Sequence, residues 1–404
     1  MVITQPAATI VDMSLVQLWE KSEQELRKKS VRQLISIAGE GRLIDGSKCA
    51  SEFRELLSYV PSEIIAAYSK YCLEEKFEDS GLALQDVVNQ IGRRLGFEVT
   101  DGRYKGVQGQ TGFDGIWKSE DGYYLVIEVK TTDAYRINLD TAAGYRAKLS
   151  EQNKIARDAS SVLIIIGRQD TGDLEAQIRG SRHAWDIRLL SVDALLQLLS
   201  IREETEDPAI QAKISQILRP RDYTRLDAVV DLVFTTAEDI QDQQLVPGPA
   251  VVKSSVHEKA ERDDPPAGFH NACIEKLSVK LGEKLVRQSR SIFVSPHGEV
   301  AMSCSVSKEY IDTSHKGYWY AFHPHQADLL KKAKKAYVAF GCGSAERIIL
   351  IPYDIFEPLL KDLNTTARPT GKTYWHVQIA DHEGKWELRR KGGLSRIDVT
   401  KYLV

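Results

Sequence analysis

The sequence predicts an α/β protein with an α/β/α core, an N-terminal helical region and a separate C-terminal α/β domain. Hydrophobic residues recur at helical spacing up to residue 95 and at strand spacing directly after it. Within 161–167 every residue from Val162 to Ile166 is apolar, which is typical of a central strand that helices cover on both faces. A stretch rich in proline, glycine and charge at 246–268 indicates a boundary between two independently packed parts.

Residues 1–77 form the predicted helical region, and an amphipathic helix over 82–95 opens the core at 78–200. Gly96 follows that helix, and glycine is favoured just past a helix end because it adopts a positive φ without strain. After Gly96 the hydrophobic period changes to two, and a turn at 119–122 joins two neighbouring strands. The expected elements are strands at 97–99, 113–117 and 123–131, a helix at 142–156, a strand at 161–167, a helix at 172–184, a strand at 187–190 and a helix at 192–200.

The remaining chain divides into a helical extension and linker at 201–267 and a C-terminal domain at 268–404. Helices are expected within 201–245, before the linker begins. The C-terminal domain is expected to start with a helix at 270–285 and to continue with strands at 291–295, 300–305, 318–322, 336–340, 348–351, 375–379 and 386–390.

Composition favours a cytoplasmic protein that does not enter a membrane. The 404 residues are 42% hydrophobic and 27% charged, which allows a real core, and no apolar run approaches the length of a membrane span. The five cysteines are scattered and never form a C-x-x-C pair, which argues against a disulfide framework and a zinc site. From residue 270 onward 21 Lys+Arg face 14 Asp+Glu, so this part is basic beside an acidic remainder and suits a polyanion partner.

The stretches 112–117 and 124–132 bring together residue types that suit phosphodiester chemistry. Alternation along the second strand places Glu128 and Lys130 on one face, and Asp114 at the start of the neighbouring strand can reach the same edge. Mg²⁺ prefers carboxylate oxygens, neutralises charge on a phosphate and helps to form hydroxide, whereas a lysine beside it orients water or stabilises charge. The plain alternative is a surface hairpin with an ordinary Glu–Lys pair. The strand is dense in Tyr, Leu, Val and Ile, so the catalytic interpretation is favoured.

The order of these motifs resembles one nuclease superfamily. A helix is followed by Leu-Gly-Phe at 95–97, Phe-Asp-Gly at 113–115, Glu-Val-Lys at 128–130, another helix and an apolar strand. This order is similar to that of the PD-(D/E)XK nucleases, particularly the restriction endonuclease-like members, over about residues 78–200. The resemblance implies a four-stranded mixed sheet between helices and the hydrolysis of phosphodiester bonds.

The resemblance also implies a cofactor and a role for each motif residue. Mg²⁺, for which Mn²⁺ substitutes, would be bound by the carboxylates of Asp114 and Glu128 and by the main-chain carbonyl of Val129. Lys130 would act on the attacking water.

One position departs from the superfamily pattern. Many members carry a glutamate on the first helix where this chain has Gln85. An amide is a poorer metal ligand than a carboxylate, which puts a second metal ion in question. Asp86 or Glu75 is a possible substitute.

Further residues are candidates for contact with DNA. Gln110, with Gln108, lies in the loop before the catalytic strand, where ordinary solvation is the alternative role. Arg179 and Arg182 recur at helical spacing and either face a phosphate backbone or form salt bridges on the helix face. A basic cluster in the C-terminal domain either binds DNA or is a solvated surface, and it consists of Lys331, Lys332, Lys334 and Lys335.

These observations predict a DNA endonuclease, similar to type II restriction endonucleases, that acts in restriction or anti-phage defence. DNA is the expected partner, and a homodimer would suit a double-strand cut. The C-terminal domain would serve recognition or regulation, since its helix-then-strands order is similar to a nuclease core without catalytic residues. Two alternatives stay open: an effector nuclease activated by a partner protein or small signal, and an inactive nucleic-acid-binding module, which Gln85 allows. The residues do not distinguish DNA from RNA.

Overall fold

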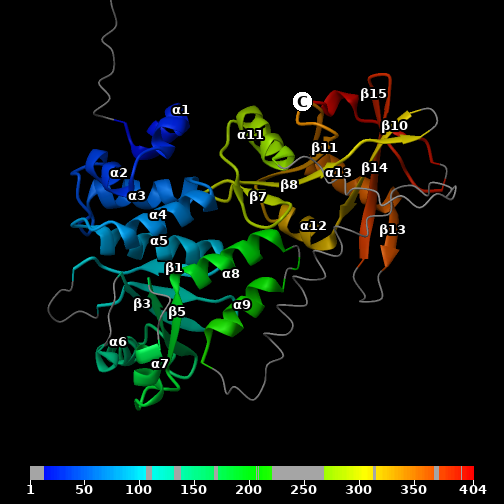
Figure 1. Ribbon diagram of the computed structural model, residues 1–404. Helices are drawn as coiled ribbons and strands as arrows, with labels where there is room; N and C mark the ends of the chain where they lie inside the picture. Colours follow the sequence, from blue (N-terminus) through cyan, green and yellow to red (C-terminus); the bar gives the residue numbers. More distant parts are fainter. Residues whose placement is uncertain are drawn as a thin grey trace, which may run out of the picture. The chain divides into compact units, whose positions relative to one another are not determined.

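The computed structural model describes residues 13–105, 112–131, 138–167, 172–205, 207, 209–220, 268–312, 315–367, 373–392 and 394–404. The chain forms two compact units, Met1–Thr236 and Ala237–Val404 (Figure 1). All five cysteines are buried and free. No helix in the described ranges is long and apolar enough to cross a membrane.

Four helices open the first unit: α1 (Leu15–Arg27), α2 (Val31–Ile37), α3 (Lys48–Tyr59) and α4 (Ser62–Glu74). Each of the first three follows a serine whose hydroxyl accepts the N–H of the third helical residue, which satisfies a donor that the helix itself leaves free. Pro61 separates α3 from α4, since proline is tolerated at the start of a helix but not in its interior. The predicted helical region is therefore confirmed over the described residues.

The centre of the first unit is a mixed five-stranded sheet, one strand more than the resemblance implies. Its strands lie side by side in chain order: β1 (Glu98–Asp101), β2 (Gly115–Lys118), β3 (Tyr124–Lys130), β4 (Ser160–Ile166) and β5 (Ile187–Ser191). The first three form an antiparallel meander, whereas β3, β4 and β5 run parallel. Every residue of β4 is buried, as expected for the central apolar strand.

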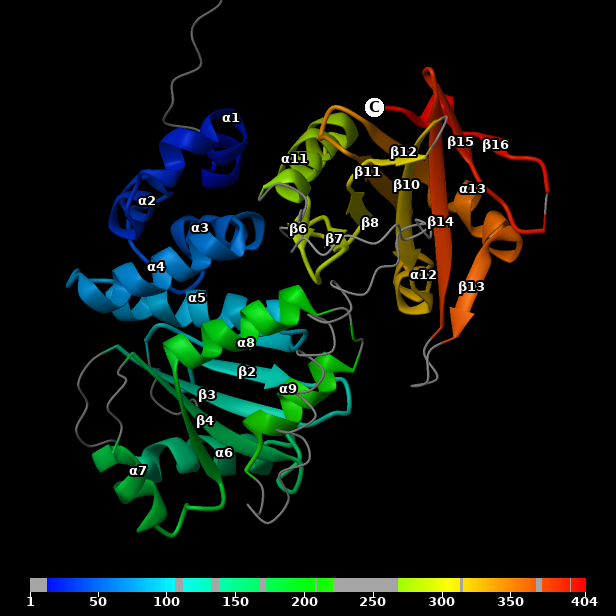
Figure 2. The same ribbon diagram turned by 45° about the vertical axis from the view of Figure 1, so that its right-hand side comes forward.

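Both faces of this sheet are covered by helices, which are α5 (Ser80–Arg94), α6 (Leu139–Glu151), α7 (Gly172–Arg179), α8 (Val192–Glu204) and α9 (Ile210–Leu218). Figure 2 shows α5 and α8 on one side of the strands and α6 and α7 on the other. Alternate side chains of β4 belong to the two hydrophobic clusters on either side. The cluster on the α5 side also contains the buried residues of α1 to α4, so the N-terminal helices and the sheet share one core.

The second unit contains a mixed and an antiparallel sheet. The mixed sheet has, in spatial order, β12 (Ile348–Pro352), β11 (Lys335–Cys342), β8 (Val300–Ser307), β7 (Ile292–Val294) and β6 (Val286–Arg287). The antiparallel sheet has β16 (Ile397–Asp398), β15 (Lys385–Leu388), β14 (Thr373–His382), β10 (His315–Phe322) and β9 (Tyr310–Asp312), with β13 (Asn364–Ala367) beside β14. The helices of its described residues are α11 (Phe269–Leu281), α12 (Pro324–Leu330), α13 (Tyr353–Phe356) and the 3₁₀ helices η2 (Glu357–Asp362) and η3 (Thr400–Tyr402).

All seven strands predicted after residue 290 are present, with shifted bounds. The strands β6, β9, β13 and β16 were not predicted, because segments of two to four residues are too short to display a hydrophobic period. The helix expected after residue 200 is found in α9. The range 221–267, with most of the predicted linker, lies outside the described residues.

The mixed sheet of the second unit repeats part of the strand order of the first. A helix, α11, precedes the antiparallel strands β6, β7 and β8, and β11 then adds parallel to β8 after α12. In the first unit α5 precedes β1, β2 and β3, and β4 adds parallel to β3 after α6. The units differ in the fifth strand, since β12 is antiparallel to β11 but β5 is parallel to β4. The second unit also inserts β9 and β10 before α12.

Candidate active site

The start of β2 is held against α5 by an asparagine and a glycine. The side-chain amide of Asn89 donates to the Asp114 carbonyl over 2.9 Å, and its Oδ1 accepts from the Trp117 indole over 3.0 Å. A Cβ on Gly115 would lie 2.2 Å from Asn89 Oδ1, so this close approach requires glycine. The Phe-Asp-Gly sequence therefore fixes the main chain of Asp114 at the edge of the sheet.

The structure brings the three predicted catalytic residues together. In the antiparallel register of β2 and β3, Gly115 lies opposite Ile127. One residue further along, Asp114 therefore lies beside Glu128. The N–H of Val129 donates to Asp114 Oδ2 over 2.6 Å, and the Lys130 ammonium forms an ion pair with Glu128. The Glu128 side chain is only 15% exposed. Two carboxylates and one ammonium therefore share a partly buried edge of the hairpin.

The charges in this cluster alter one another's protonation. Burial, and then the nearby charge of Glu128, raise the pKa of the Asp114 carboxyl to about 6. The hydrogen bond from the Val129 N–H and the charge of Lys130 lower this pKa but do not outweigh the rise. Burial lowers the pKa of Lys130, but the hydrogen bond and charge of Glu128 outweigh it, so the pKa is raised from its ordinary value. Lys130 is therefore a cation at neutral pH, and the paired carboxylates favour the arrival of further positive charge.

The donor set suits Mg²⁺ rather than a softer metal. Asp114 and Glu128 supply carboxylate oxygens on adjacent strands, and the Val129 main chain lies between them. Mg²⁺ is commonly held by one or two carboxylates, with water and substrate phosphate in its other positions. Among the described residues no group of three or more His, Cys, Asp or Glu side chains gathers as a metal-binding cluster. The residues thus fit an ion that keeps most of its water.

The helix carboxylate expected by resemblance is not supplied by Asp86. Its carboxylate is buried, accepts from Arg54 Nε over 2.9 Å and accepts from the Tyr104 hydroxyl. Burial raises the pKa of Asp86 to about 6 although Arg54 and Tyr104 lower it. The other suggested substitute, Glu75, is exposed after the end of α4. Asp86 is therefore committed to a polar network that joins α3 and α5.

Gln85 faces a different environment from its neighbour. It lies one helical turn before Asn89 and so shares the sheet-facing side of α5. Its side chain is 3% exposed, and its amide nitrogen has no hydrogen-bond partner in the described ranges. A buried donor without a partner costs stability. The Gln85 amide N–H groups are therefore hydrogen-bond donors without an acceptor in the described part of the chain, on the helix that holds Asp114.

The structure describes two of the four candidate DNA-contact residues of the first unit. Gln108 and Gln110 lie outside the described residues. Arg179 forms an ion pair with Glu175 over 2.9 Å, and Arg182 forms one with Asp140 over 2.7 Å. Both arginines are largely exposed, and exposed ion pairs stabilise little, so a phosphate can compete for either.

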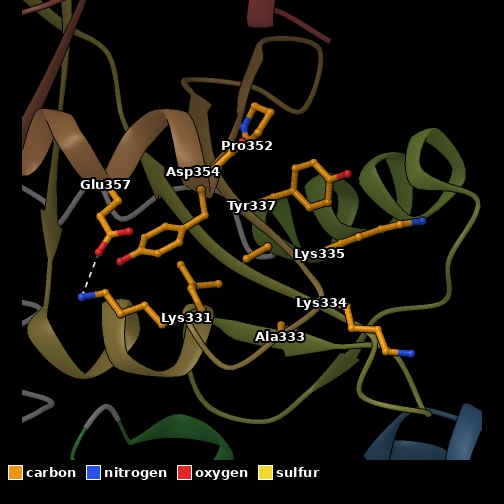
Figure 3. A pocket seen from close by; sticks show the side chains of 11 residues that line it. Lys331, Ala333, Lys334, Lys335, Tyr337, Pro352, Asp354 and Glu357 are labelled. Atoms are coloured by element: carbon orange, nitrogen blue, oxygen red, sulfur yellow. Dashed lines mark ion pairs between the residues drawn. The ribbon is translucent and has the colours of Figure 1, made fainter.

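The lysine cluster of the second unit runs from Lys331, just after α12, to Lys335, the first residue of β11, rather than along a helix face. Lys331 pairs with Glu357 over 2.8 Å, and both side chains line a pocket of the second unit (Figure 3). Lys334 pairs with Glu299. Lys332 and Lys335 form no ion pair with a carboxylate that the structure describes. The cluster thus includes ammonium groups that an external anion can engage.

Asn89 is a residue of the candidate site that the sequence did not indicate. It stands among apolar residues of an amphipathic helix, and only its contacts with Trp117 and Asp114 distinguish it from an ordinary buried amide. Tyr145 on α6 is a further polar group near the site, because its charge interaction with Lys130 contributes to the raised pKa of that lysine.

The described strands of the second unit offer no equivalent constellation at the corresponding position. Its β7 and β8 stand in the order of β2 and β3, but their sequences, Ile-Phe-Val and Val-Ala-Met-Ser-Cys-Ser-Val-Ser, contain no carboxylate and no lysine. The catalytic candidates therefore belong to the first unit. No family model and no curated protein matches this chain, so the functional argument depends on the geometry of the site.

Proposed function

We propose that the chain is a Mg²⁺-dependent endonuclease that hydrolyses phosphodiester bonds in DNA. The observation that carries the proposal is the convergence of Asp114, Glu128 and Lys130 at adjoining edges of β2 and β3. The mixed sheet between two helical layers agrees with the resemblance to PD-(D/E)XK nucleases. A fold alone does not assign chemistry, so the residue types at this edge matter more than the architecture.

Each residue of the cluster has a distinct role in this proposal. Asp114, Glu128 and the Val129 carbonyl would hold Mg²⁺, which supplies charge neutralisation and a more acidic bound water. Lys130 donates to the attacking water or to a phosphate oxygen and stabilises the charge that develops there. That charge grows as the water oxygen bonds to phosphorus and the bond from phosphorus to the leaving sugar oxygen breaks. Asn89 holds the main chain of Asp114 in place, which keeps the carboxylate oriented.

The proposed setting is cytoplasmic restriction or anti-phage defence, with the second unit in recognition or regulation. The absence of carboxylates and lysines from β7 and β8 supports a non-catalytic role for that unit, and its free ammonium groups suit a phosphate partner. A double-strand cut would need two catalytic centres, so a homodimer on DNA is part of the proposal.

Cleavage of supercoiled plasmid tests the proposal. The full chain is incubated with plasmid carrying modified or unmodified cytosine, with and without Mg²⁺, beside an RNA of matched sequence. Nicked or linear DNA that requires the metal, and is lost in Asp114→Ala, Glu128→Ala and Lys130→Ala, is the expected result. Cleavage that appears only after a partner protein or cell extract is added would favour the effector nuclease. A folded chain that binds DNA but never cleaves it would favour the inactive module.

A further inference from the structure

The proposed catalytic residues face one of the two helical layers that cover the sheet of the first unit. Val126 on β3 belongs to the hydrophobic cluster that also contains Leu139 and Leu149 of α6. Side chains alternate along a strand, so Glu128 and Lys130 lie on the same face of β3 as Val126. Figure 2 shows α6 on this side of the strands. A side chain of α6 that reaches the end of β3 can therefore contact the same substrate as Glu128 and Lys130.

Tyr145 on α6 reaches this end of the sheet. Its ring is partly buried and packs against the same hydrophobic cluster. A Cβ added to Gly112, two residues before Asp114, would lie 3.3 Å from the Tyr145 hydroxyl oxygen. Burial lowers the pKa of Lys130, and the hydrogen bond and charge of Glu128 raise it. Electrostatic interactions with Asp114 and with Tyr145 add to that rise. The Tyr145 hydroxyl therefore lies close both to the chain that leads into Asp114 and to the Lys130 ammonium.

The Tyr145 hydroxyl is an unused hydrogen-bond donor at the cluster. It has no hydrogen-bond partner among the described residues, and it is not fully buried. The ionised carboxylates of Asp114 and Glu128 only accept hydrogen bonds, and Lys130 already donates to Glu128. A DNA phosphate is an acceptor as well, and it is negatively charged. What holds a phosphate at this edge must therefore be the metal ion together with donors such as Lys130 and Tyr145.

We infer that the Tyr145 hydroxyl donates a hydrogen bond to a non-bridging oxygen of the phosphate that is cleaved. The inference rests on the proposed nuclease function and separates the roles of the two donors: Lys130 acts on the attacking water, and Tyr145 holds the phosphate. Charge on the phosphoryl oxygens must be stabilised in the transition state, and a donor that packing fixes in advance does so without reorganisation. Because the phenol brings no positive charge, it should contribute more to the rate than to the affinity for DNA.

A second tyrosine of the same cluster provides a matched control. Tyr124 at the start of β3 is also partly buried against these apolar residues. Its hydroxyl likewise has no hydrogen-bond partner in the described ranges. It also lies near a lysine, since the pKa of Lys118 is raised by the hydrogen bond and charge of Glu98 and then by Tyr124. Tyr124→Phe therefore removes the same chemical group at the end of β3 that is remote from the site.

Initial rates of plasmid nicking at saturating Mg²⁺ are compared for wild type, Tyr145→Phe and Tyr124→Phe. Losing a hydrogen bond to a charged group should slow Tyr145→Phe by roughly 10- to 100-fold and leave Tyr124→Phe within about twofold of wild type. DNA affinity, measured with Ca²⁺ in place of Mg²⁺, should change by less than about threefold in both variants. Both melting temperatures should stay close to that of wild type, because neither hydroxyl has a partner to lose within the described structure.

Phosphorothioate DNA adds a readout that a purely structural role of Tyr145 would not change. Sulfur in place of a non-bridging oxygen is a weak acceptor, so it should slow wild type more than it slows Tyr145→Phe, because both changes remove the same hydrogen bond. Three results would overturn the inference while wild-type cleavage still supports the nuclease: equal slowing of the two proteins by sulfur, wild-type nicking by Tyr145→Phe, or an equal loss in Tyr124→Phe. A wild-type chain that never cleaves DNA would refute the nuclease proposal and this inference together.

Discussion

Replacing Glu128 with glutamine removes one negative charge from the candidate active site and preserves the shape of the side chain. Lys130 is its ion-pair partner, and the charge of Glu128 raises the pKa values of both Asp114 and Lys130. The substitution should therefore lower both pKa values and remove one carboxylate from the proposed Mg²⁺ site. It leaves the main-chain N–H that holds Asp114 in place.

The expected effects on catalysis and on folding differ in size. Losing one group that stabilises the transition state costs on the order of 10²–10³ in rate, or about 3–4 kcal/mol, and a metal ligand at least that much. The ion pair contributes far less to folding, because the Lys130 side chain is 36% exposed and such pairs stabilise by about 1 kcal/mol or less. The melting temperature should thus move by only a few degrees while cleavage nearly disappears.

The same sheet provides a matched control. Glu98 on β1 pairs with Lys118 on β2 over 3.1 Å, so Glu98→Gln breaks a Glu–Lys pair of the same hairpin region away from the site. Initial rates of plasmid nicking at saturating Mg²⁺ are measured for wild type and both variants, together with their melting temperatures. A Glu128→Gln protein that cleaves at the wild-type rate would refute the assignment. So would an equal loss of activity in Glu98→Gln.

Three further predictions concern the metal, the polar network and the second unit. Mg²⁺ and Mn²⁺ should support cleavage, Ca²⁺ should bind without turnover, and full activity in excess EDTA would exclude a metal mechanism. The pKa of Asp86 is raised to about 6 in the folded state, so between roughly pH 4 and 6 this carboxyl is protonated more often in the folded chain than in the unfolded chain. The free energy of unfolding should therefore fall as the pH rises through that window. Denaturant titrations of wild type and Asp86→Asn test this, and identical pH profiles would contradict it. The fragment 268–404 should fold alone and bind duplex DNA with an affinity that falls steeply with salt. Gel shifts measure how the DNA affinity changes with salt concentration, and this dependence should weaken when four residues are changed together to glutamate, namely Lys331, Lys332, Lys334 and Lys335. A folded fragment without DNA affinity at low salt would favour a partner-controlled effector.

Periodicity predicted the core of the first unit because its signals are local. The helix before Gly96, the hairpin with Asp114 and Glu128, and the buried strand β4 each show a pattern within a short window of sequence. The same reasoning placed the three catalytic candidates on one edge, since alternation along β3 and a tight hairpin are both local properties. The contribution of Asn89 is not local, because it depends on α5 packing over β2.

The metal-ligand position on the first helix of the core shows why part of the candidate site could not be predicted from the sequence. In the sequence, Gln85 stands where the superfamily pattern has a glutamate, and Asp86 or Glu75 was a possible substitute for the missing carboxylate. Arg54, 32 residues away from Asp86, decides between them, because a buried carboxylate paired with a guanidinium is not free to bind a cation. The sheet-facing position then belongs to Gln85, whose amide is a weak ligand. With Asp114 and Glu128 as the carboxylates of the cluster, the proposed nuclease would bind a single Mg²⁺ ion, and Lys130 would be the second positive charge beside the phosphate.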